Sequence, residues 1–445
     1  MKRDAYQELL TWSDAPGRKP LLMRGARQTG KTYLLRAFGR ERYAASHYFN
    51  FEQTPALASL FERDLDPLRI VRDLSVFAGE RIVPGGSLLI LDEIQACNAA
   101  LNSLKYFAED APQYHVAAAG SLLGVALSTP RSFPVGKVDF VDLHPMTFLE
   151  FLDAVGAGRY RTLIEEHPAP EPFPGAFHTV LVDLLRAYYF VGGMPEAVAR
   201  YAANRDNQNP AEVRTVQQAI LDAYVLDFAK HAPAREVARI IAVWDSLPGH
   251  LARENKKFMF SAIRPSARAR DYEEAVVWLE GAGLILRAFG VETARLPLRG
   301  FADRRSFKVY ALDVGLLGAL AGAAPQLLVH GDRLFAEYRG ALVENYVAQQ
   351  LAAAAAGDLH YWRSSGGKAE VDFLLERSGE VVPLEVKSGV NPRSKSLRSF
   401  DSQFAPAMLV RSTLLNLKRD ARVLNIPLYA VPDALRFVGD LDARG

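Results

Sequence analysis

Hydrophobic residues occur with two different spacings over the first 150 residues. Short apolar runs occur at 20–24, 46–51, 87–91 and 115–119, and segments with helical spacing lie between them. Continuous apolar runs are typical of strands buried on both faces of a parallel sheet, and helices connect such strands. The pattern therefore predicts an α/β domain with a parallel sheet over residues 1–150.

The pattern becomes mainly helical after this domain. We expect a helical lid region at 151–225, interrupted by a proline-rich loop at 168–174. Further helical segments follow, and then two β-like runs, around 284–291 and 307–312. Helices followed by a hairpin predict a winged-helix-like domain at 226–325.

Composition narrows the class of protein. The chain has 445 residues, more than one hydrophobic core usually organises, so two or three domains are expected. Its 49% hydrophobic and 23% charged residues are ordinary for a globular protein. Cys97 is the single cysteine, which rules out a disulfide within the chain. With no apolar leader and no run of about 20 apolar residues, we expect a soluble, cytoplasmic protein with no membrane contact.

A glycine-rich segment joins the first apolar run to a helical segment. It has the pattern G-x-x-x-x-G-K-[ST], with the residues Gly25, Ala26, Arg27, Gln28, Thr29, Gly30, Lys31 and Thr32. Such loops surround phosphates with backbone N–H groups at a helix N-terminus. Lys31 is expected to contact the β- and γ-phosphates and Thr32 to ligate Mg²⁺. The segment predicts a site for ATP and Mg²⁺.

A second element supports this prediction. The apolar run at 87–91 is followed by Asp92 and Glu93, as in a Walker B strand. Asp92 is expected to hold Mg²⁺, and Glu93 to act as general base on the attacking water. Ser121 follows the next strand and is a candidate contact to the γ-phosphate. Alternatively, Asp92 only caps a turn and Ser121 belongs to an ordinary loop.

The chain resembles the bacterial and archaeal AAA-type ATPases that carry a C-terminal domain related to the PD-(D/E)xK nucleases. Besides the phosphate loop and Leu91-Asp92-Glu93, the resemblance rests on the segments 143–148, 189–196, 370–373 and 385–389. It covers nearly the whole chain. It implies a P-loop AAA-type parallel-sheet ATPase domain, a helical and winged-helix middle region, and an α/β restriction-endonuclease-like domain at 330–445.

The last of these domains contains a predicted β-hairpin. A two-residue turn at Ser378-Gly379 places Asp372 opposite Glu385 and puts Lys387 on the same face. Apposed carboxylates repel unless a cation lies between them, so this face is a candidate metal site. The resemblance adds Glu344 as a metal ligand and Lys387 as the residue that positions or activates water. The alternative is a solvated hairpin face with cross-strand salt bridges.

Cations gather before the helix expected at 272–280. They are Lys256, Lys257, Arg264, Arg268 and Arg270. In a winged helix this position is close to the recognition helix, which favours contact with DNA. A solvated basic face, in a winged helix that contacts other proteins, is the alternative.

These observations predict an ATP-hydrolysing AAA-type enzyme that acts on nucleic acid, with DNA as partner. We also expect a homo-oligomer, because a neighbouring arginine usually completes AAA-type sites. Two other functions fit the same residues. One is a regulatory NTPase that controls a protein partner, and the other is an ATP-dependent DNA-binding protein with an inactive nuclease fold.

Overall fold

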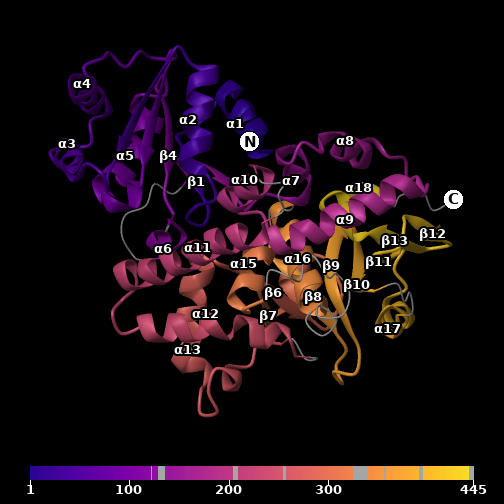
Figure 1. Ribbon diagram of the computed structural model, residues 1–445. Coiled ribbons are helices and arrows are strands. Elements are labelled where there is room, and N and C mark those ends of the chain that lie inside the picture. Colours follow the sequence, from indigo (N-terminus) through magenta and orange to yellow (C-terminus); the bar gives the residue numbers. More distant parts are fainter. Residues whose placement is uncertain are drawn as a thin grey trace. The chain divides into compact units, whose positions relative to one another are not determined.

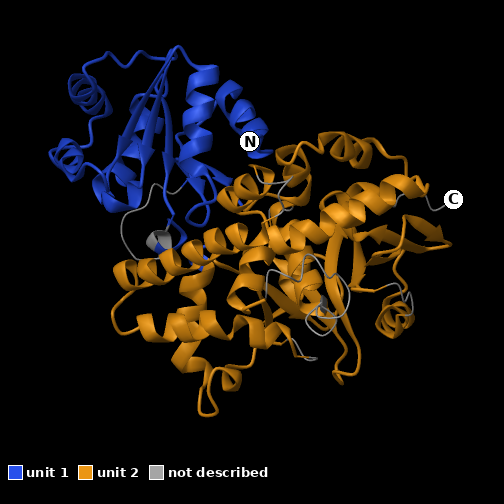
Figure 2. Ribbon diagram, viewed as in Figure 1, with its two compact units in different colours: residues 1–144, 281–283 blue, residues 145–280, 284–445 orange. Residues whose placement is uncertain are grey.

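The computed structural model describes residues 1–121, 123–128, 136–203, 209–253, 257–323, 339–354, 357–389 and 394–439. The chain forms two compact units, coloured separately in Figure 2. Unit 1 comprises residues 1–144 and 281–283, and unit 2 comprises residues 145–280 and 284–445. None of the described helices is both long and apolar enough to cross a membrane.

Unit 1 contains a five-stranded sheet with the order β2-β3-β4-β1-β5, in which every neighbouring pair is parallel. Its strands are β1 (Leu21–Arg24), β2 (Ala45–Asn50), β3 (Ser87–Asp92), β4 (His115–Ala119) and β5 (Asp139–Asp142). The four apolar runs are thus confirmed as strands of a parallel sheet. The sequence pattern did not reveal β5 because this edge strand buries only Val141 fully.

Helices cover both faces of this sheet, as the continuous apolar runs predict (Figure 1). In β3, Leu88 and Ile90 pack with α1 (Ala5–Asp14) and α2 (Lys31–Arg42). The alternate residues Leu89 and Leu91 face the opposite core. This second core is built with α3 (Ser59–Glu62), α4 (Pro67–Ala78) and α5 (Asn98–Asp110). The short α6 (Leu123–Ser128) follows β4.

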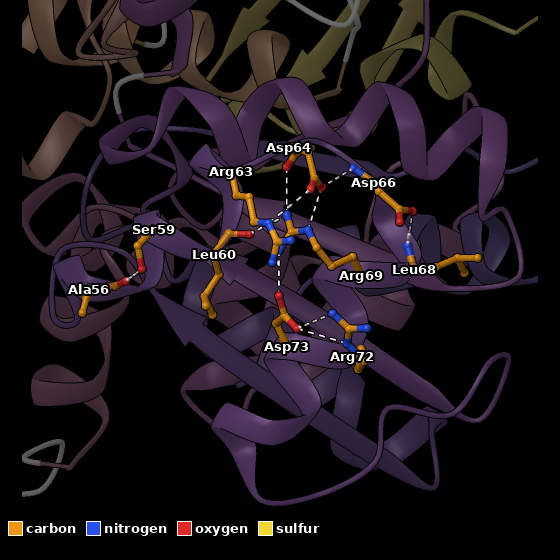
Figure 3. Close-up of polar contacts among 10 residues, drawn as sticks. All are labelled: Ala56, Ser59, Leu60, Arg63, Asp64, Asp66, Leu68, Arg69, Arg72 and Asp73. Carbon is orange, nitrogen blue, oxygen red and sulfur yellow. Dashed lines mark hydrogen bonds and ion pairs between the residues drawn. The ribbon is translucent and has the colours of Figure 1, made fainter.

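A buried guanidinium fixes the connection between α3 and α4 (Figure 3). Arg69 has only 8% of its side chain exposed and forms ion pairs with Asp64 at 2.6 Å and Asp73 at 2.7 Å. It also donates to the carbonyl oxygens of Leu60 and Asp64, both at 2.9 Å. Asp66 begins α4 by accepting from the amide of Leu68. Arg69 therefore joins two carboxylates and two carbonyl groups of the α3–α4 segment around one guanidinium.

Unit 2 begins with the helices expected from the sequence. They are α7 (Phe148–Ala154), α8 (Gly158–Glu166), α9 (Gly175–Val191), α10 (Pro195–Ala203), α11 (Pro210–His231), α12 (Val237–Leu251) and α13 (Ala269–Gly281). The proline-rich segment at 168–174 lies between α8 and α9, as predicted. Later helices are α14 (Leu298–Phe301), α15 (Val314–Leu320), α16 (Arg339–Ala354), α17 (Lys395–Phe404) and α18 (Ala434–Val438).

The strands of unit 2 form one mixed, eight-stranded sheet with the order β12-β13-β11-β10-β9-β8-β6-β7. They are β6 (Ile285–Val291), β7 (Ala302–Ala311), β8 (Leu359–Arg363), β9 (Glu370–Arg377), β10 (Glu380–Val386), β11 (Leu409–Thr413), β12 (Lys418–Asp420) and β13 (Val423–Pro427). β6 and β7 pair as the expected antiparallel hairpin, but β6 also pairs in parallel with β8. The boundary predicted between residues 325 and 330 therefore does not separate two sheets. Alternation within strands could not reveal this pairing, because the two partners are far apart in the sequence.

A buried carboxylate packs against the segment 189–196, one of the motifs that carry the family resemblance. Asp313 is fully buried and accepts hydrogen bonds from the amides of Gly193 at 2.6 Å and Leu316 at 2.9 Å. A Cβ on Gly192 would lie 2.1 Å from the Asp313 carboxylate, and one on Gly193 would lie 2.0 Å from the carbonyl oxygen of Met146. The glycine pair is therefore explained by packing within unit 2.

The Arg69 contacts predict a selective loss of stability on substitution. Arg69→Met keeps much of the apolar stem but leaves the two carbonyl groups and two carboxylates without this donor. We expect the free energy of unfolding to fall by about 1–3 kcal/mol, measured by urea denaturation. The control is Arg72→Met, because the Arg72 side chain is 69% exposed and forms an ion pair with Asp73 at 3.3 Å. This substitution should change stability by less than about 0.5 kcal/mol. Equal effects of the two substitutions would contradict this account.

Candidate functional site

The predicted phosphate loop lies between β1 and α2, and its backbone has the conformation that glycine allows. Gly25 and Gly30 have φ angles of 145° and 95°, both in the region that side chains disfavour. A Cβ on Gly25 would lie 2.2 Å from the carbonyl oxygen of Leu143. Position 25 therefore requires glycine for space as well as for conformation.

The ammonium group of Lys31 points into this loop. Its Nζ donates to the carbonyl oxygens of Gly25 at 2.9 Å and Ala26 at 2.8 Å. The Thr29 hydroxyl also donates to Ala26, and the Arg3 guanidinium donates to the carbonyl of Thr29 at 2.7 Å. Burial lowers the pKa of Lys31 to about 8, although the charges of Glu93 and Asp92 act in the opposite direction. The carbonyl groups of the loop thus surround the ammonium of Lys31.

Asp92 ends β3 beside the start of α2. Its Oδ2 accepts from the Thr32 hydroxyl at 2.8 Å and from the Tyr48 hydroxyl at 2.7 Å. The fold therefore brings together the two residues predicted to hold Mg²⁺. Sequence analysis missed Tyr48. The signal for it is its place in β2, two residues before Asn50, because Asn50 pairs with Asp92 of β3.

Glu93 follows Asp92 with a φ of 50°, an uncommon conformation for a residue other than glycine. Its Oε2 accepts from Gln95 Nε2 at 2.6 Å and from the Ser121 hydroxyl at 3.4 Å. Ser121 is only 8% exposed. The predicted base and the predicted γ-phosphate contact therefore lie together, and Gln95 is a contact that sequence analysis did not identify.

These residues fit Mg-ATP. Gly25 keeps the loop free of a side chain, and Gly30 precedes α2 as its N-cap residue. Hydroxyl and carboxylate oxygens are the ligands that Mg²⁺ prefers, and Thr32 and Asp92 lie within 2.8 Å of each other. Arg27 and Gln28 belong to the same loop, and Gln28 has a left-handed φ of 67°.

The register of the C-terminal hairpin is confirmed. Ser378 and Gly379 have φ angles of 48° and 75°, which suits a two-residue turn. The paired residues include Phe373 with Leu384. Continuing this register places Asp372 opposite Glu385, and Asp372 Oδ2 accepts from the amide of Val386 at 2.8 Å.

A lysine that sequence analysis missed lies among the predicted metal ligands. Lys308 of β7 is fully buried, and its Nζ lies 3.1 Å from Glu344, 2.7 Å from Glu370 and 3.8 Å from Asp372. The Tyr310 hydroxyl donates to Glu344 at 2.6 Å. The attraction of the three carboxylates outweighs burial and raises the pKa of Lys308 above its usual value. A lone lysine among apolar strand residues (Phe307 to Tyr310) was the available signal.

The polar face predicted for the hairpin is only partly exposed, since the Lys387 side chain is 41% exposed and that of Asp372 is 18% exposed. Glu385 is only 2% exposed, and it pairs with Lys387 at 2.6 Å and accepts from Ser394. Burial acts to lower the pKa of Lys387, but the hydrogen bond to Glu385 and nearby carboxylates raise it. Within the described ranges, no group of three His, Cys, Asp or Glu has the arrangement of a metal site. The ammonium of Lys308 lies near Glu344, Glu370 and Asp372, whereas Glu385 pairs with Lys387.

The cations predicted to contact DNA lie partly at the surface. Arg264, Arg268 and Arg270 are exposed before and at the start of α13. Arg264 lies over the Tyr272 ring, 5.7 Å from its centroid. Lys256 lies outside the described residues. These contacts are compatible with a nucleic-acid surface and with an ordinary charged face.

Three family models match the chain. Residues 17–152 match an AAA domain, residues 182–327 a domain of unknown function (DUF8612), and residues 339–430 another domain of unknown function (DUF4143). The chain therefore carries an AAA-type ATPase domain with a parallel sheet. Uncharacterized proteins of Mycobacterium tuberculosis and Mycobacterium bovis are each 37% identical over 115 residues. That match spans 25% of this chain and 25% of each relative.

Solved structures show weaker likeness. A Walker-type ATPase of Pyrococcus abyssi is 16% identical, with a TM-score of 0.44, over 72% of this chain and 95% of that one. The ORC1 protein of Aeropyrum pernix, in complex with DNA, is 15% identical over 73% and 93%, with a TM-score of 0.32. The Thermotoga maritima RuvB Holliday junction branch migration motor is 16% identical over 69% and 92%, with a TM-score of 0.30. These scores do not establish a common fold over the aligned length.

The lowered pKa of Lys31 predicts pH-dependent nucleotide binding. The ammonium is the form that attracts phosphate, so affinity is complete below pH 8 and is lost as the pH rises through that value. We expect the Kd for the Mg²⁺ complex of a non-hydrolysable ATP analogue to increase about tenfold between pH 7 and pH 9, measured by calorimetry. Lys31→Arg is the control, because its guanidinium stays charged: it should bind more weakly but with a flat profile. A flat profile with Lys31 present would contradict the prediction.

Proposed function

We propose that unit 1 binds Mg-ATP and hydrolyses it. The observation that carries this proposal is the cluster at the ends of β1, β3 and β4. There Lys31 points into a glycine loop, Thr32 and Asp92 share a hydrogen bond, and Glu93 lies beside Ser121. The AAA domain match over residues 17–152 supports the same activity.

Each residue has a role that its position allows. Lys31 and the loop amides bind the β- and γ-phosphates, and Thr32 and Asp92 hold Mg²⁺, with Tyr48 orienting the Asp92 carboxylate. Mg²⁺, when bound, neutralises phosphate charge that develops during the reaction. Glu93 accepts a proton from the attacking water, and Ser121 donates a hydrogen bond toward the γ-phosphate.

Two substitutions separate binding from hydrolysis. Lys31→Ala should weaken ATP binding strongly, because it removes the charge inside the loop. Glu93→Gln should keep the affinity within about threefold and lower kcat by about 100-fold or more, because only the base is lost. Binding is measured by calorimetry and turnover by phosphate release. Unchanged turnover in Glu93→Gln would refute the role of Glu93.

We further propose that ATP hydrolysis serves an action on DNA by a homo-oligomer. The exposed Arg264, Arg268 and Arg270 support a DNA surface, and the β6–β7 hairpin after α11–α13 supports a winged-helix-like domain at 226–325. The helical region at 151–225 would then act as the lid.

A regulatory NTPase with a protein partner is the competing function. Turnover measured with and without single-stranded, duplex and branched DNA separates them, since only the first function predicts stimulation.

A second candidate function concerns unit 2, where residues 330–445 would form a nuclease-like domain. Glu344, Glu370, Asp372 and Glu385 face two ammonium groups, those of Lys308 and Lys387. Carboxylate oxygens are ligands that Mg²⁺ prefers, and the four carboxylates lie on neighbouring elements, three of them around Lys308. Glu344, Asp372 and Glu385 would hold Mg²⁺, and Lys387 would position water against a phosphodiester. An ATP-dependent DNA-binding protein with an inactive nuclease fold is the alternative.

This second function predicts a metal-dependent gain in stability. Mn²⁺ or Mg²⁺ should raise the melting temperature of the full chain by ligand linkage, in proportion to ln(1 + [L]/Kd). The shift should disappear in Asp372→Asn and persist in Lys387→Met, because ammonium does not ligate metal. To avoid the metal at unit 1, all variants carry Thr32→Ala and Asp92→Ala. If metal neither stabilises the chain nor supports cleavage of DNA or RNA, the cluster has no metal-dependent activity.

A further inference from the structure

We infer that Gln95 is a positioning residue for hydrolysis, and that it holds the carboxylate of Glu93 against the end of strand β4. This inference rests on the proposed ATPase activity, and it adds a residue to which neither the sequence motifs nor the comparisons give a role. It is carried by the contacts of Gln95 with Glu93 and with Gly120.

Gln95 makes the shorter of the two side-chain hydrogen bonds to the proposed base. Its Nε2 lies 2.6 Å from Glu93 Oε2, whereas the Ser121 hydroxyl lies 3.4 Å from the same atom. An ionised carboxylate only accepts hydrogen bonds, so the nitrogen of the amide must face Glu93. A hydrogen bond to a charged group at this distance restricts the carboxylate to one orientation.

The backbone explains why residue 95 can reach back to residue 93. Glu93 has a left-handed φ of 50°, and the 3₁₀ turn Ile94–Ala96 follows at once. Ile94 is fully buried and anchors this turn in the core of unit 1. A strained backbone next to a proposed catalytic group persists only where the surroundings fix it. The turn and its anchor provide that constraint.

Gly120, directly after β4, leaves the space that Gln95 occupies. A Cβ on Gly120 would lie 2.1 Å from Gln95 Oε1 and 3.2 Å from its Cδ. Gly120 is not among the glycines with positive φ, so space rather than backbone freedom accounts for it. The amide of Gln95 is therefore in contact with the strand end that carries Ser121, and it connects this strand end to Glu93.

The other end of the amide lacks a partner. Gln95 Oε1 is buried and has no hydrogen bond among the described residues. A buried acceptor without a donor destabilises the fold, so packing efficiency alone does not explain a glutamine here. The hydrogen bond to Glu93 is the interaction that an apolar residue of similar size would not supply.

The test compares Gln95→Met with two matched variants, using the full chain. Gln95→Met keeps the length of the side chain but removes the donor, so kcat for ATP should fall by about tenfold with the Kd for ATP unchanged. Gln7→Met, at an exposed position of α1, is the control and should leave both values unchanged.

Gly120→Ala tests the same contact from the other side. Its methyl group would lie 2.1 Å from Gln95 Oε1 and 2.9 Å from Leu123 Cγ. It should displace the Gln95 amide and lower kcat as Gln95→Met does, and in a Gln95→Ala background only the smaller effect of the Leu123 contact should remain. Fully additive effects would overturn the inference, as would a wild-type kcat in Gln95→Met. Glu93→Gln is measured in parallel. If its turnover is normal, the proposed ATPase mechanism fails as well; if it is inactive while Gln95→Met is normal, only the inference about Gln95 fails.

Discussion

The candidate site of unit 1 depends on the parallel arrangement of β1, β3 and β4. Parallel strands end at the same edge of a sheet, so the residues that follow them meet there although they are far apart in the sequence. The phosphate loop follows β1, Asp92 ends β3, and Ser121 lies just beyond β4. The order β3-β4-β1 places these three strands side by side. If the strands were mispaired, neither the Thr32–Asp92 contact nor the Glu93–Ser121 contact would form.

Close backbone approach is a second constraint, and it operates in both units. In unit 1, Gly25 lies against the carbonyl of Leu143 and Gly120 lies against Gln95. In unit 2, Gly192 lies against Asp313 and Gly193 against Met146. The motif containing Gly192 and Gly193 thus has a structural explanation that involves no ligand.

Buried charge distinguishes the two candidate sites. In unit 1 a single ammonium, Lys31, is buried in a loop of carbonyl groups, and its pKa falls to about 8. In unit 2 the ammonium of Lys308 lies among three carboxylates, and its pKa rises. The first site holds a cation that an anion would stabilise, which suits phosphate. The second has carboxylates that already hold a cation, so a metal ion there must bind in addition to Lys308 or displace it.

The sequence by itself determined the features that depend on neighbouring residues. Apolar runs predicted four strands of unit 1, the glycine pattern predicted the loop at 25–32, and the turn at Ser378-Gly379 predicted the hairpin register, because local spacing fixes each of these. Tertiary structure alone decided the pairing of β6 with β8 and the placing of Lys308 among carboxylates from α16 and β9. It also decided the contact of Gln95 with Gly120. These contacts join residues 25 to 71 positions apart, and periodicity along one segment carries no information about which distant segment will pack against it.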